Sequence, residues 1–222
     1  MDGIEEWARA QERVIDLMSG LSPEQVATHV PACPDWTVRD LFSHMVGLGA
    51  DVVAGNEPDD HPEDWTARQV DDRREHDVAT LVDEWRALNG PLREWMAEHG
   101  VRPLGDVIIH EQDLRGAVGV PGARDTPGLA AIRDRFTGRF DAAVADRAPI
   151  ALLGPGWQWV SRDAAPDDAA VVLRAPDFEF ARALMTRRSA DQLRSWTVQG
   201  DVEPYLDGFA LLGPLPSSDL TE

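Results

Sequence analysis

The sequence has no lysine, a single cysteine and few basic residues of any kind. All 21 basic residues are arginine, against 40 Asp and Glu, so the formal net charge is -19. Nucleic acids and anionic membranes bind basic surfaces, and we therefore expect neither as a partner. The absence of lysine excludes Schiff-base chemistry on a lysine side chain. The one cysteine, Cys33, excludes an internal disulfide and is consistent with a reducing cytoplasm.

Long apolar runs are also missing. No stretch of about 18 apolar residues occurs, so we expect no transmembrane helix. The first residues, MDGIEEWARA, are acidic and lack the apolar core of a signal peptide. We expect a cytoplasmic protein. Its 222 residues can form one large or two small domains, and either can bury a substantial core.

Apolar residues recur at helical spacing in the first half of the chain. The expected helices cover residues 4–18, 38–54, about 65 to 99, and 103 to about 116. Thr37 and Asp40 resemble a capping box at the start of the second, and Gly90-Pro91 is expected to kink the third. Four amphipathic helices in about 120 residues indicate a four-helix bundle.

The second half has a different pattern. The glycine- and proline-rich segment VGVPGARDTPG separates it from the bundle. A helix over about 129–145 is followed by β-type runs at 150–153, 158–161 and 170–173, and then by FEFARALMTRRSADQLRSW, which predicts one or two helices. We predict an α+β protein with a helical bundle over residues 1–122 and a smaller α+β domain over residues 123–222.

Three residues on two predicted helices form a candidate metal site. Asp106 and His110 are four apart in GDVIIHEQDL, so they share one helix face. His44 falls on the apolar stripe of its own helix, so we expect it to point into the bundle. Three buried polar groups need partners, because unpaired burial costs several kcal/mol. One divalent ion would satisfy all three, and two imidazoles with one carboxylate leave a coordination position open.

Each of these residues also has a simpler interpretation. A single histidine on an apolar face is more often a hydrogen-bonded core residue. Asp106 is also favoured near a helix start by the helix dipole, and a D-x-x-x-H spacing is a weak motif. If a metal binds, the ligand types suit Zn²⁺ and also Ni²⁺ or Fe²⁺.

Three further residues could support such a site. Glu111 and Asp113 flank His110, and either could accept a hydrogen bond from an imidazole N–H, or could simply be solvated. Cys33, in a proline turn before a helix, could act as a nucleophile. The more common role of a free cysteine is that of a small buried apolar residue.

Binding residues outside the metal site are suggested by arginine and tryptophan. Arg187 and Arg188 in LMTRRSADQL could hold a substrate carboxylate with two parallel hydrogen bonds, although an exposed helix end is the alternative. Most of the eight Trp are expected in the core. Trp36, beside the helix of His44, could instead line a pocket.

Three segments together resemble one known family. CPDWTVRDLFSHMVG resembles the motif that carries the first metal histidine in the mycothiol-dependent maleylpyruvate isomerase family, a part of the wider DinB-like group of metal-binding bundles. DVIIHEQDLRGAVG is similar to its second motif, in which an acidic residue and a histidine four positions later complete the site. LMTRRSADQLRSWTVQGDVEPYL resembles its C-terminal region.

The resemblance implies a fold and an activity. It implies a DinB-like four-helix bundle that binds zinc or a similar ion through His44, Asp106 and His110, followed by a small sterol-carrier-like α/β domain. It implies isomerisation of maleylpyruvate to fumarylpyruvate, with mycothiol as the thiol cofactor. The family's prototype has Glu where this chain has Asp106, which is one methylene shorter. We take Trp36 as a cofactor-binding candidate and Arg187 and Arg188 as catalytic candidates.

Three functions follow from such a site. In the first, an activated thiolate adds to the double bond of the substrate, the resulting single bond rotates, and elimination regenerates the thiol. In the second, the same thiolate attacks an electrophile, which makes the protein a mycothiol S-transferase. In the third, the protein binds a metal or small ligand without catalysis. All three imply small-molecule partners, with no nucleic acid and no membrane.

Overall fold

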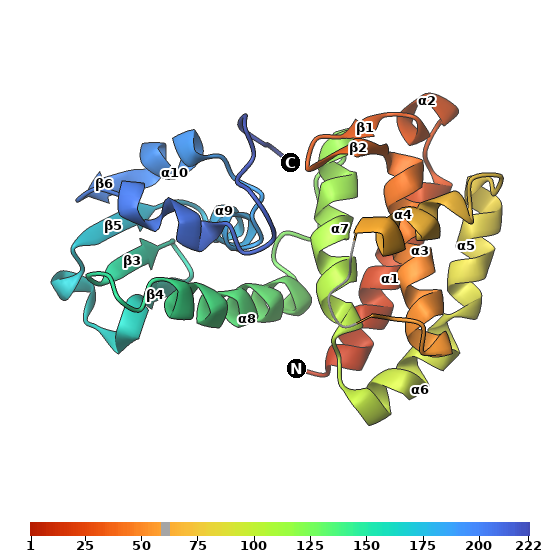
Figure 1. Cartoon of the computed structure of the whole chain (residues 1–222), viewed down its shortest axis with the longest axis horizontal. Coiled ribbons are helices and arrows are strands. Elements are labelled where there is room, and N and C mark those ends of the chain that lie inside the picture. Colours follow the sequence, from red (N-terminus) through yellow and green to blue (C-terminus); the bar gives the residue numbers. More distant parts are fainter. Residues whose placement is uncertain (59–62) are drawn as a thin grey trace. The chain divides into compact units, whose positions relative to one another are not determined.

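The computed structural model describes residues 1–58 and 63–222, which form two compact units (Figure 1). The first comprises residues 1–123 together with Glu222, and the second comprises residues 124–221. The first is mainly helical, and the second contains helices and a four-stranded sheet. The predicted α+β class is confirmed. Within the described part of the chain, no helix is both long enough and apolar enough to cross a membrane.

The first unit is a bundle of four helices. These are α1 (Gly3–Ser19), α3 (Val38–Ala54), α5 (Val78–Ala87) and α7 (Pro103–Val118). Each contacts the next around the bundle: α1 packs on α7, α7 on α3, α3 on α5, and α5 on α1. Aromatic residues fill the centre, where the rings of Phe42 and Trp85 meet edge to face at 5.3 Å. The predicted helical bundle is confirmed.

Shorter elements complete this unit. They are α2 (Pro23–Val26), β1 (His29–Val30), β2 (Cys33–Thr37), α4 (Glu63–Asp71) and α6 (Asn89–His99). β1 and β2 form an antiparallel hairpin that leads directly into α3. α4 packs against α3, and α6 packs against α1, α3 and α5. The hairpin was not predicted, because Pro34 within CPDWT argues against a strand.

The single long helix predicted over about 65 to 99 is wrong, because three helices, α4, α5 and α6, occupy this region. A new helix starts after Asp77, whose carboxylate accepts hydrogen bonds from the backbone N–H and the hydroxyl of Thr80. α5 ends at Ala87, the residue whose carbonyl would pair with Pro91 in a continuous helix. Pro91 has no N–H to donate, so the break falls there.

The second unit combines a mixed sheet with helices. Its elements are α8 (Pro127–Ala143), β3 (Ile150–Leu153), β4 (Gln158–Val160), η1 (Ser161–Asp163), η2 (Pro166–Asp168), β5 (Val171–Arg174), α9 (Asp177–Leu184), α10 (Ala190–Trp196), β6 (Thr197–Gln199) and η3 (Glu203–Phe209). The strand order is β4-β3-β5-β6, with β3 and β5 parallel and the outer pairs antiparallel. All of β3 is buried, which explains its continuous apolar run.

The three strands predicted in this half are found as β3, β4 and β5, and β6 is an addition. The predicted one or two helices are two, α9 and α10. Thr186 lies between them with a φ of 60°, a left-handed conformation that ends α9. The likeness to sterol-carrier domains stays a prediction.

A capping box starts the helix that carries His44, and its removal should be measurable. The Thr37 hydroxyl accepts from the Asp40 backbone N–H at 3.2 Å, and the Asp40 carboxylate accepts from the Thr37 N–H at 3.1 Å. We expect Thr37→Ala to lower the free energy of unfolding by about 1 kcal/mol in urea denaturation. Thr37→Ser keeps the hydroxyl and should keep most of the stability. An equal loss in both variants would contradict this explanation.

Candidate metal centre

His44 reaches the bundle interior from the second turn of α3. The helix begins immediately after the capping box, and His44 is only 5% exposed. The predicted inward orientation is therefore confirmed. The Trp36 ring, on β2, lies 5.0 Å from the His44 ring at an angle of 38°. The hairpin that leads into α3 thus brings Trp36 to one side of the histidine.

Asp106 and His110 both come from α7. Pro103 occupies the first turn of this helix, where a missing N–H costs nothing, and Gly119 ends it in the left-handed conformation. Because Asp106 and His110 are one turn apart, their side chains project from the same side. α7 packs directly against α3, which brings this side to His44.

The three side chains converge on one point. Asp106 Oδ2 lies 3.4 Å from His44 Nε2 and 3.4 Å from His110 Nε2. The two imidazole rings are nearly perpendicular, with centroids 5.4 Å apart. In a tetrahedral zinc site with bonds of about 2.0–2.1 Å, neighbouring ligand atoms are about 3.3–3.4 Å apart. The carboxylate of Asp106, although one methylene shorter than that of Glu, therefore lies within ligand reach of both imidazoles.

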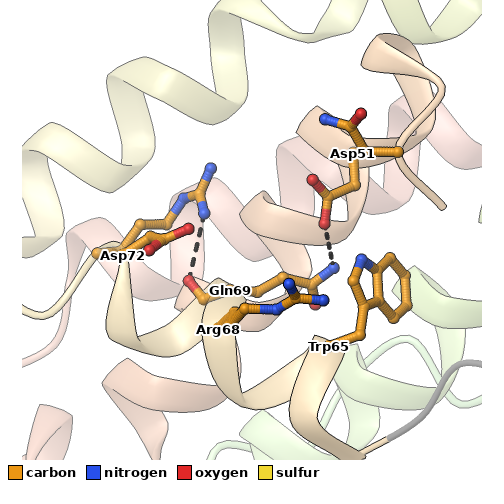
Figure 2. Close-up of a pocket in the computed structure, with 7 residues that line it drawn as sticks. Asp51, Trp65, Arg68, Gln69 and Asp72 are labelled. Atoms are coloured by element: carbon orange, nitrogen blue, oxygen red, sulfur yellow. Dashed lines mark hydrogen bonds between the residues drawn. The ribbon is translucent and has the colours of Figure 1, made fainter. Parts of the chain in front are cut away.

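Gln69 supports His44 from behind. Its side-chain oxygen lies 2.8 Å from His44 Nδ1, and its side-chain nitrogen donates to Asp51 Oδ2 at 2.8 Å. Figure 2 shows the Gln69 amide directed toward the Asp51 carboxylate. Gln69 is only 3% exposed. Neither Gln69 nor Asp51 could be predicted as a site residue, because the sequence spacing of α4 and α3 does not show that the two helices meet.

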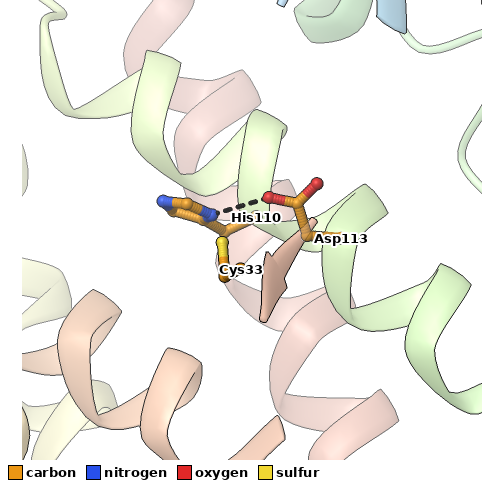
Figure 3. Close-up of side chains that lie close together, drawn as sticks. All are labelled: Cys33, His110 and Asp113. Carbon is orange, nitrogen blue, oxygen red and sulfur yellow. Dashed lines mark hydrogen bonds and ion pairs between the residues drawn. The ribbon is translucent and has the colours of Figure 1, made fainter. Parts of the chain in front are cut away.

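Asp113 supports His110 in the same way. His110 Nδ1 lies 2.9 Å from Asp113 Oδ2, one turn further along α7 (Figure 3). Of the two acceptors predicted for an imidazole N–H, Asp113 is confirmed. Glu111 instead accepts hydrogen bonds from Arg13 and Arg115.

These partners determine which ring nitrogens are available to a metal. The carboxylate of Asp113 only accepts hydrogen bonds, so His110 Nδ1 carries the proton and Nε2 carries the lone pair. At His44 the amide oxygen of Gln69 has the same effect. Two lone pairs and one carboxylate oxygen thus face each other, and a cation between them would relieve their mutual repulsion. The residues present fit a divalent metal ion.

Cys33 takes part in a second group of possible ligands, with His110 and Asp113. Figure 3 shows the Cys33 sulfur, from β2, beside the His110 ring. Here the donors compete, because Asp113 already accepts the proton of His110 Nδ1. The group of His44, Asp106 and His110 is therefore the better metal site. The thiol is half-buried beside this site rather than inside the core.

The two arginines predicted to hold a substrate carboxylate belong to the second unit. Their predicted alternative, an exposed helix end, is wrong, because both are buried. Arg188 Nε donates to Glu179 at 2.6 Å, and Arg187 Nη1 donates to the carbonyl of Met185 at 3.1 Å. Both bind acceptors of the second unit itself. A role for Arg187 and Arg188 in substrate binding stays a prediction.

Comparison with known proteins identifies the first unit. Residues 7–115 match the family described as the mycothiol maleylpyruvate isomerase N-terminal domain. No curated protein and no solved structure matches the chain. The matched segment contains all three converging residues, His44, Asp106 and His110. The match covers most of the N-terminal unit and confirms the resemblance of the two bundle motifs to this family.

Proposed function

We propose that this protein is a divalent-metal-dependent enzyme that uses mycothiol as cofactor and isomerises maleylpyruvate to fumarylpyruvate. The observation that carries the proposal is the convergence of His44 Nε2, His110 Nε2 and Asp106 Oδ2. The match of the N-terminal unit to the isomerase family supports the reaction and the cofactor. We propose zinc as the metal because two imidazoles and a carboxylate form a known zinc ligand set, with nickel as the second choice.

Some residues of the protein would bind the ion, and others would orient the residues that bind it. His44, Asp106 and His110 would hold the ion through one atom each and leave a position open for an exogenous ligand. A bound divalent ion would favour the thiolate form of a coordinated thiol near neutral pH. Gln69 and Asp113 would keep the imidazoles oriented. Trp36, half-buried against His44, would present an apolar ring to the cofactor.

The decisive experiment compares product and thiol in one reaction. Zinc-loaded protein is mixed with maleylpyruvate and a small amount of mycothiol, and both fumarylpyruvate and free thiol are followed over time. We expect many product molecules per thiol and a constant thiol concentration, because the thiol is regenerated in each turnover. His44→Ala should abolish this turnover.

Two other outcomes would replace the proposed reaction. Loss of one thiol per product, with a stable adduct, would make the protein a mycothiol S-transferase. Stoichiometric zinc without any thiol-dependent turnover would make it a metal-binding protein. Both outcomes keep the metal site and reject the isomerase.

A further inference from the structure

A chain of hydrogen bonds runs from Asp51 through Gln69 to His44. The two bonds are both 2.8 Å long, and Gln69 is buried between the helices α3 and α4. Asp51 and His44 lie on α3 seven residues apart, so they occupy the same side two turns from each other. Gln69 is the residue of α4 that connects them.

The donors and acceptors of these two hydrogen bonds can be assigned in only one way. A carboxylate only accepts hydrogen bonds, so the Gln69 nitrogen must face Asp51 and its oxygen must face His44. An amide oxygen also only accepts, so His44 Nδ1 must carry the proton. The His44 Nε2 lone pair is then directed to Asp106 and His110. The charge of Asp51, two bonds away, thus determines which nitrogen of His44 is available.

We infer that Gln69 is a positioning residue of the metal site, and that Asp51 acts through it. Gln69 holds His44 in the one tautomer that can bind a metal through Nε2. Asp51 prevents the Gln69 amide group from flipping. The inference rests on the proposed metal site. Partners behind metal-binding histidines typically contribute 10–100-fold to metal affinity.

The position of Asp51 makes this hypothesis testable without touching the histidine. Asp51 and Gln69 line a pocket of about 360 Å³ together with Trp65, Arg68 and Asp72 (Figure 2). Substitutions at Asp51 therefore fall at the rim of a pocket rather than in the packed centre of the bundle. The side-chain contact of Asp51 in the direction of His44 is the hydrogen bond from the Gln69 amide.

The first test measures zinc affinity by competition with a chromophoric chelator. Gln69→Leu should weaken zinc binding by about 10–100-fold, because His44 loses the acceptor that fixes its tautomer. Gln11→Leu is the matched control. Gln11 is an equally buried glutamine on α1 that bonds to the Trp85 carbonyl and to Asn89, so its loss should leave zinc affinity within about two-fold of wild type.

The second test reverses the hydrogen bond between positions 51 and 69 and keeps an acceptor for His44 Nδ1. Asp51→Asn alone removes the group that fixes the amide, and should weaken zinc binding several-fold. In the double variant Asp51→Asn with Gln69→Glu, the new carboxylate at position 69 accepts the hydrogen bond from His44 Nδ1. The new amide nitrogen at position 51 then donates to the same carboxylate. It should restore zinc affinity to near the wild-type value. A purely structural role would instead make the two substitutions add.

A third readout does not need the metal. Nitrogen NMR of the metal-free protein should show His44 as the Nδ1–H tautomer in wild type and as a mixture in Gln69→Leu. Should this variant fail to fold, Asp51→Asn and the double variant decide the question. Unchanged zinc affinity in both single variants, Asp51→Asn and Gln69→Leu, would overturn the inference. Absence of zinc binding by wild type would reject the proposed function instead, and the tautomer measurement would still test the positioning role.

Discussion

His110→Ala is expected to weaken zinc binding by more than 100-fold and to remove the metal from purified protein. The wild-type chain should carry about one zinc per molecule after dialysis without chelator. Loss of one of three protein ligands should exceed the 10–100-fold effect typical of a supporting residue. His110 is also shared by both groups of possible ligands among the residues that the structure describes, so neither group is complete without it. Metal analysis by mass spectrometry, with chelator competition for the affinity, measures both quantities.

His99→Ala is the control for this prediction. His99 is an exposed histidine on α6 that bonds to the Trp95 carbonyl, and it belongs to neither group of possible ligands. It should keep full zinc content. Equal zinc content in wild type and His110→Ala would show that the ion is held elsewhere, and would reject the site.

Glu111→Gln is expected to cost about 3 kcal/mol of stability while leaving zinc affinity nearly unchanged. Glu111 is 1% exposed and accepts three hydrogen bonds from the guanidinium of Arg13, at 2.9, 3.2 and 2.7 Å, and two from Arg115, both at 3.1 Å. Removing one partner of a buried ion pair typically costs about 3–5 kcal/mol. Both arginines keep some contact with water, which favours the lower end.

Urea denaturation measures the stability effect, and the zinc competition assay measures the affinity. Glu98→Gln, at an exposed position of α6, should change neither. The two measurements together distinguish the stability role expected for Glu111 from the metal-binding role expected for its neighbour His110. A large loss of zinc affinity without a loss of stability would assign Glu111 to the metal site and contradict the geometry.

The residues of the candidate metal site could be predicted from the sequence because the position of each depends on local periodicity. Asp106, His110 and Asp113 lie on one helix, where spacings of three and four place side chains together. His44 could be added because its apolar neighbours determine which side of α3 is buried. Gln69 could not be found in this way. It contacts His44 only because α4 packs against α3, and that packing is a tertiary contact between segments 25 residues apart.

The sequence explains why one long helix was predicted where the structure has three. Apolar residues continue at helical spacing through α4, α5 and α6, so periodicity alone joins them. The interruptions come from Asp77, which is a strong helix-starting residue, and from Pro91, which cannot donate a backbone hydrogen bond. Such local signals indicate a break even where the apolar stripe continues.

The two histidines of the site have unlike partners, a carboxylate behind His110 and a neutral amide behind His44. With a divalent ion bound, the negative charges of Asp106 and Asp113 together balance the two positive charges of the ion. A second carboxylate in place of Gln69 would leave the loaded site with a net negative charge. A neutral amide at this position would avoid one negative charge directly beside His44, which would favour the approach of an anionic thiolate or carboxylate to a bound ion in a chain whose formal net charge is -19.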